Sequence, residues 1–157
     1  MIFILQKFTK FNNKLGYRKQ GIIGGVMQYM IEWLRTNRND ILKKYPEADP
    51  ELSFFMDYFV TSTGEYTFIS ILKDAIRGEG SSLQETSSYL LMDDVVDEGH
   101  IIDAVEFYFN GEFDGKVPFK VFASVLELIA LAYAEHNPEE KGQIIHLIPH
   151  LKKVYDI

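Results

Sequence analysis

The residues best suited to chemistry in this chain are seven carboxylates that lie close together near its middle. They occupy one acidic run and the aromatic segment after it: Asp93, Asp94, Asp97, Glu98, Glu106, Glu112 and Asp114. Clustered carboxylates can hold Mg²⁺ or Ca²⁺, but the ligand spacing and the glycine of a helix–loop–helix calcium site are absent here. They can also attract and steer a basic protein. We therefore interpret the cluster as a candidate protein-binding surface, the alternative being a solvated surface that only aids solubility.

The remaining candidate groups do not form a recognisable catalytic or metal site. His146 and His150 are four residues apart and could ligate one metal ion, but no Glu lies between them and Pro149 interferes with a helix there. The glycine-rich stretch 21–25 is not followed by the Lys-Ser/Thr of a phosphate-binding loop. No G-x-S-x-G motif and no cysteine occur, so neither a serine elbow nor a thiolate is available. We expect no enzyme activity, no metal and no cofactor.

Charge is distributed unevenly along the chain, whose formal net charge is −7. Residues 1–30 carry five basic residues and no acid, whereas residues 49–115 carry fifteen acids against only Lys73 and Arg77, a net charge of −13. This central block would repel phosphates, since nucleic-acid binders concentrate Lys and Arg where they meet the backbone. We expect a basic protein partner and no nucleic acid.

Length and composition indicate one globular domain. The chain has 157 residues, of which 46% are hydrophobic and 25% charged, enough for a single core. No apolar run approaches the roughly 18 residues that span a bilayer. The apolar start, residues 1–5, is followed by lysines and not by the longer apolar stretch of a secretory signal. Together with the absence of cysteine, these features predict a cytoplasmic protein with no membrane partner.

Apolar residues repeat with helical spacing over the first half of the chain. The pattern predicts three helices, over residues 26–42, 50–62 and 65–77. Thr63-Gly64 separates the second from the third, and Gly78 supplies a stop after the third.

The apolar spacing then changes to two, which is typical of strands. It predicts strands over residues 89–92, 104–110 and 116–119. Asn110-Gly111 is a strong signal for a two-residue hairpin turn. Asp114-Gly115 is a second candidate turn, and it leaves the register of the last strand open.

The C-terminal part predicts two further helices. Residues 119–136 are apolar on most sides, so Phe122, Leu126 and Ile129 are expected to anchor the core. Asn137 is expected to cap the final helix, with a proline at its first position. Helices, then antiparallel strands, then two helices make an α+β fold, a small antiparallel sheet covered by helices.

The order of motifs in the later part of the chain resembles that of a known family. The acidic run 93–99 leads to the aromatic strand 105–111, and the segment 119–122 opens a helix that ends in the sequence 133–141, YAEHNPEEK. This order resembles the CdiI immunity proteins of bacterial contact-dependent growth inhibition, in particular the ribonuclease toxin immunity proteins. Residues 1–30 have no counterpart in that pattern.

The resemblance implies a small cytoplasmic protein that binds and blocks the C-terminal toxin domain of its cognate CdiA protein. Family members neutralise nucleases, often RNases, and a nuclease needs a basic cleft to hold its substrate. The acidic block complements such a cleft, and the seven carboxylates are expected to contribute to the toxin-facing surface. The alternative function is an antitoxin or another acidic protein-interaction module of a different toxin system.

The change in composition also suggests where the folded domain begins. Residues 27–157 are expected to form a single immunity-protein domain. Residues 1–26 are either an upstream extension, with translation starting at Met27 or Met30, or a basic arm that folds onto the acidic block. On the first reading, a chain that begins at Met27 is expected to fold.

Overall fold

The computed structural model describes residues 22–61, 66–84 and 86–157. The segment 1–21 and the expected break at Thr63-Gly64 lie outside these residues. Within them the chain forms five α-helices, one short 3-10 helix and a four-stranded antiparallel sheet. The expected α+β class is confirmed, with helices before the sheet and two helices after it.

The helices follow the apolar pattern, with differences at their ends. They are α2 (Ile22–Lys44), η1 (Pro46–Ala48), α3 (Asp49–Thr61), α4 (Phe68–Arg77), α5 (Phe119–Glu135) and α6 (Pro138–Tyr155). The expected start of α4 at Glu65 is wrong, because Thr67 caps the helix by accepting the Ser70 N–H at 3.2 Å. Gly78 ends α4 in the left-handed conformation at φ +78°.

The first helix begins earlier than its apolar pattern indicates. It runs through Gly24-Gly25, because glycine lowers helix stability by only about 1 kcal/mol relative to alanine and packing can outweigh that cost. The expected domain boundary between Val26 and Met27 therefore falls inside α2, and both side chains are buried in the core.

The C-terminal helices match in position but differ in capping. Asn137 precedes α6 as expected, yet its side chain makes no capping hydrogen bond. It donates instead to Glu140 Oε2 at 2.7 Å and to the Tyr133 hydroxyl at 3.3 Å. The expected interference by Pro149 is also wrong, since α6 continues past it.

The sheet has the order β1-β2-β3-β4, with every neighbouring pair antiparallel. Its strands are β1 (Ser81–Leu83), β2 (Ser87–Leu90), β3 (Val105–Phe109) and β4 (Glu112–Val117). Asn110-Gly111 forms the expected turn between β3 and β4, with both residues at positive φ. Asp114-Gly115 is not a turn. It lies within β4 at a bulge, where the pairing steps from Phe113 to Gly115. β1 was not expected, because three residues are too few to show an alternation.

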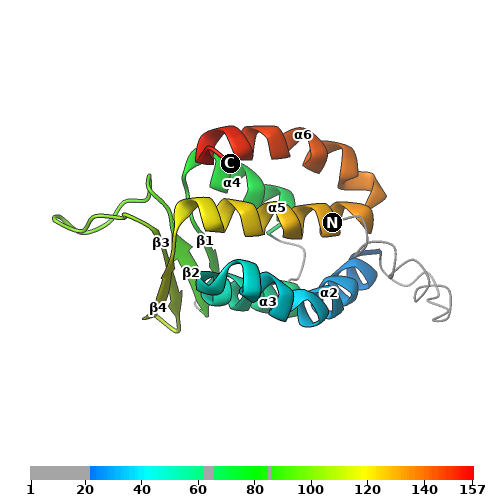
Figure 1. Ribbon diagram of the computed structural model, residues 1–157, viewed down its shortest axis with the longest axis horizontal. Coiled ribbons are helices and arrows are strands. Elements are labelled where there is room, and N and C mark those ends of the chain that lie inside the picture. The colour runs from blue at the N-terminus through cyan, green and yellow to red at the C-terminus, as the bar shows by residue number, and fades with distance from the viewer. Residues whose placement is uncertain (1–21, 62–65, 85) are drawn as a thin grey trace.

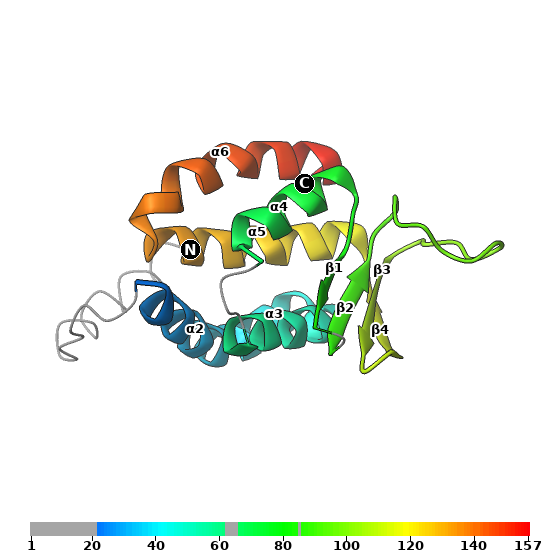
Figure 2. The same cartoon turned by 180° about the vertical axis from the view of Figure 1, so that it is seen from behind.

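All the helices lie to one side of the sheet (Figure 1), and the view from behind agrees (Figure 2). Aromatic rings fill the space between: Tyr89 of β2 lies 4.8 Å from Phe54 of α3 and 5.3 Å from Phe122 of α5, between ring centroids. Phe122, Leu126 and Ile129 are fully buried, as expected. None of the described helices is long and apolar enough to cross a membrane.

One carboxylate lies inside this core. Glu51, in the first turn of α3, has an exposed fraction of 0%, and neither of its oxygens has a hydrogen-bond partner among the described residues. Burial raises the pKa of this carboxyl well above its ordinary value. The helix-covered side of the sheet thus holds an acid that resists ionisation.

Candidate functional site

The sheet has one face covered by the helices and one face turned away from them, here called the open face. Successive side chains of a strand alternate between faces, and the register fixes which of them are neighbours. Leu90, Glu106 and Lys116 form one row across β2, β3 and β4. Tyr108 and Phe113 form the next row, with ring centroids 5.8 Å apart.

A long connection between β2 and β3, residues 91–104, projects beyond this face and is here called the overhang (Figure 1). Its first turn is fixed by Asp94, whose Oδ2 accepts the backbone N–H groups of Leu91 at 2.6 Å and Gly80 at 2.9 Å. The first bond closes the turn at the start of the overhang, and the second ties that turn to Gly80, the residue before β1. Asp94 therefore has a structural task at the start of the overhang.

The C-terminal end of the overhang, residues 100–103, is held by a charged network around Glu106. This carboxylate is only 2% exposed. Its Oε2 is 2.9 Å from His100 Nε2 and accepts a hydrogen bond from the Tyr108 hydroxyl at 2.8 Å, while Oε1 lies 3.7 Å from Lys116 Nζ. Lys116 also donates to Asp103 at 2.7 Å. Two contacts, from His100 and Asp103, thus join the overhang to strands β3 and β4.

This network keeps Glu106 ionised in spite of its burial. Burial alone raises the pKa of the carboxyl, but the hydrogen bonds from Tyr108 and His100 and the positive charges nearby outweigh that effect and hold it below its ordinary value. A carboxylate can only accept hydrogen bonds. The contact of Glu106 with His100 Nε2 holds the imidazole ring in one orientation.

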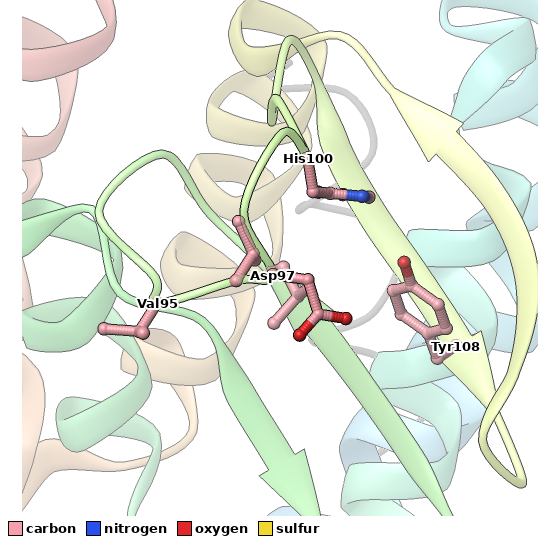
Figure 3. A pocket seen from close by; sticks show the side chains of 6 residues that line it. Val95, Asp97, His100 and Tyr108 are labelled. Carbon is pink, nitrogen blue, oxygen red and sulfur yellow. The ribbon is translucent and has the colours of Figure 1, made fainter.

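A cavity of about 390 Å³ opens between the overhang and the open face (Figure 3). It is lined by Leu90, Val95, Val96, Asp97, His100 and Tyr108. Figure 3 shows the Asp97 carboxylate, the His100 ring and the Tyr108 ring bordering one space. The lining contains no hydroxyl or amine nucleophile other than the Tyr108 phenol, whose proton is engaged by Glu106.

The seven carboxylates expected at this surface divide into two groups. Five are exposed and have no side-chain hydrogen bond or ion pair with any described residue: Asp93, Asp97, Glu98, Glu112 and Asp114. Asp94 is half-buried and holds the overhang. Glu106 does not lie at the surface as expected, because the overhang covers it and three side chains surround it. The alternation of apolar and polar residues in the sequence placed Glu106 on the opposite face of its strand from Val105 and Phe107. It could not show that a loop would fold over that face.

Several residues of this region were not identified from the sequence. His100, Asp103 and Tyr108 join the charged network, and large apolar side chains stand exposed beside the acids: Met92, Val95, Ile101, Phe109 and Phe113. Val95 is fully exposed and Phe113 is 57% exposed. The only signal in the sequence was that apolar residues such as Val95 and Ile101 lie between the acids of one loop; exposed apolar residues are common on surfaces, so this signal was weak.

Two other features carry less chemistry. A cavity of about 310 Å³ between α2 and α5 is lined mainly by apolar side chains, and its acids Asp40 and Glu135 are paired with Lys43 and Lys141. The rings of His146 and His150 lie 5.3 Å apart. Among the described residues no group of three or more His, Cys, Asp or Glu is placed to hold a metal ion.

The open face and the overhang concentrate the charge of the protein. Residues 91–117 contain eight carboxylates and one lysine, a formal charge of −7 that equals the net charge of the whole chain. Unpaired carboxylates interleaved with exposed apolar groups can bind a cationic and partly apolar surface. Comparison with protein-family models, with curated proteins and with solved structures finds no match to this chain.

Proposed function

We propose that this protein is an immunity protein of a contact-dependent growth inhibition system, which binds and neutralises the C-terminal nuclease domain of its cognate toxin. The observation that carries the proposal is the composition of the open face and overhang. Within residues 91–117, unpaired Asp93, Asp97 and Glu98 of the overhang are interspersed with exposed Val95 and Ile101, and unpaired Glu112 and Asp114 lie on β4, on either side of exposed Phe113. Such a surface suits a basic nuclease, which needs positive charge to hold its nucleic-acid substrate.

The mechanism follows from long-range and short-range forces acting in turn. The charge of −7 over residues 91–117 attracts a basic domain and accelerates encounter, by about 10- to 1000-fold in steered complexes at low salt. Exposed apolar groups then lose water against the partner, which slows dissociation. Occupying the basic cleft would deny it to RNA or DNA, so inhibition needs no catalytic group on this protein. Such a protein would act in the cytoplasm, where the delivered nuclease meets its substrate.

The test uses the toxin domain encoded beside this gene and two charge-matched variants. One variant carries Asp97→Lys and Glu112→Lys, within the proposed surface. The other carries Glu47→Lys and Glu139→Lys, two exposed carboxylates elsewhere that are likewise unpaired among the described residues. Both changes add the same charge, so non-specific electrostatics affects both alike.

We expect the first variant to associate at least about tenfold more slowly at low salt and to protect cells poorly. The second should change association by less than about twofold and retain protection. Equal effects of the two variants, or binding by neither variant nor parent, would contradict the proposal.

A further inference from the structure

We propose that the cavity under the overhang is a binding site for an arginine side chain of a protein partner. The inference deepens the proposed function and rests on it for the identity of that partner. The cavity itself is defined by residues of β2, β3 and the overhang, and can be tested with small probes alone.

The polar wall of the cavity has one free charge. Asp97 lines it, and its carboxylate has no hydrogen bond or ion pair with any other described side chain. Glu106, which lies behind the His100 and Tyr108 walls, is already held by His100, Tyr108 and Lys116, and the neighbouring Glu98 does not line the cavity. A cation entering the cavity would therefore find Asp97 as its counter-ion.

The flat walls favour a planar cation. The rings of Tyr108 and His100 border the same space as the Asp97 carboxylate (Figure 3). A guanidinium stacks on aromatic rings and offers a fork of N–H donors to a carboxylate, whereas an ammonium is a compact and strongly hydrated point charge. These preferences select arginine over lysine.

The apolar lining suits the rest of the side chain. Leu90 and Val96 also line the cavity and could cover the methylene groups that precede the guanidinium, while Val95 at the rim is fully exposed. The volume of about 390 Å³ holds one long side chain with some water. An anion such as phosphate would face the Asp97 carboxylate and would find no Lys or Arg in the lining, so it is disfavoured.

The cavity is built before any ligand arrives. Glu106 is a positioning residue, since it accepts from both the His100 and the Tyr108 side chains and so fixes two walls. Asp94 anchors the overhang at its start through two backbone N–H groups. A preformed site loses less conformational entropy on binding.

The test is a titration of the full chain, labelled with ¹⁵N, with N-acetyl-argininamide and then with N-acetyl-lysinamide, followed by NMR. We expect saturable shifts at Asp97, His100 and Tyr108 with a dissociation constant of about 1 mM, as suits so small a ligand. The lysine probe should bind at least about fivefold more weakly. Asp97→Asn should weaken the arginine probe about tenfold, and Glu98→Gln, an adjacent exposed carboxylate that does not line the cavity, by less than about twofold.

Each contrary outcome has a distinct meaning. Equal binding of the two probes, or equal effects of the two substitutions, would show only diffuse charge attraction and would overturn the cavity assignment. If the arginine probe behaves as expected but the toxin domain does not bind, the proposed function fails while the cavity remains a guanidinium site. If the toxin binds and the probe does not, the cavity assignment fails alone.

Discussion

The two sides of the sheet shift the pKa of a buried carboxylate in opposite directions. On the helix-covered side Glu51 has no partner among the described residues, and burial raises the pKa of its carboxyl. On the open face Glu106 is almost equally inaccessible, yet donors from His100 and Tyr108 keep its pKa below the ordinary value. Burial alone therefore does not decide whether an acid is charged, because the supply of hydrogen-bond donors can reverse its effect.

The difference also separates the packed side of the sheet from the side where we propose binding. The covered side is filled by aromatic rings and admits no partner. The open face holds one ionised carboxylate fixed under the overhang, and five exposed carboxylates of the overhang and β4 have no side-chain partner among the described residues. The covered side therefore carries the packing, and the open face with the overhang is the region where we propose recognition.

The largest expected effect compares an aromatic ring on each side. Phe122 is fully buried against Tyr89 and Phe107. Phe122→Ala should therefore lower the unfolding free energy by about 3–5 kcal/mol. Phe113 is exposed on the open face, so Phe113→Ala should lower the unfolding free energy by less than about 0.5 kcal/mol. Chemical denaturation of the two variants measures both values. A small loss for Phe122→Ala would contradict the division into a packed and an open side.

The next effect concerns the charged network of the open face. Glu106→Gln should destabilise the fold by about 1–3 kcal/mol at neutral pH, because an amide oxygen that accepts from His100 and Tyr108 turns the amide NH2 group toward the Lys116 ammonium, in place of a carboxylate oxygen. Tyr108→Phe removes one donor only and should cost less. Because the folded pKa of Glu106 is lowered, the stability that its charge contributes is present above the unfolded value near 4.5 and is lost as pH falls through the folded value.

The opposite pH dependence is expected for the core acid. Since the folded pKa of Glu51 is raised, its contribution is fully retained below the unfolded value near 4.5 and declines as pH rises toward the folded value. Glu51→Met should therefore stabilise the protein by about 1–2 kcal/mol at neutral pH and by less at pH 4. Unfolding curves at several pH values test both acids. If the change in unfolding free energy varied with pH in the same direction for the Glu51 and Glu106 variants, the two carboxyls would not have oppositely shifted pKa values.

The features that the sequence predicts well are those set by residues close to one another along the chain. Periodicity along the chain identified five helices and the β3 strand, and it predicted the burial of Phe122 because a helix that is apolar on most sides must be covered. The Asn110-Gly111 turn was equally local. The role of Asp114-Gly115 was not, since whether it forms a turn or a bulge depends on the partner strand.

The candidate site shows the same limit. The acidic run was evident, but its division into structural and unpaired carboxylates depends on contacts such as Asp94 with Gly80 and Lys116 with Asp103. Burial of Glu106 depends on the path of the overhang, which carries no periodicity. Charge along the chain therefore predicted the region, and only the fold distinguished the residues within it.

The smallest expected effect on stability is at the unpaired carboxylates themselves. Neutralising Glu98, Glu112 and Asp114 together should change the unfolding free energy by less than about 0.5 kcal/mol, or raise it slightly, because each is exposed and bonded to no described side chain and all three repel their neighbours. Denaturation at low salt and at about 1 M salt measures that repulsion, since screening should abolish any gain. A loss above about 1 kcal/mol would show that these side chains hold the overhang as Asp94 does. A neutral result would show that the fold does not need these three carboxylates, which is what the proposed binding role requires of them.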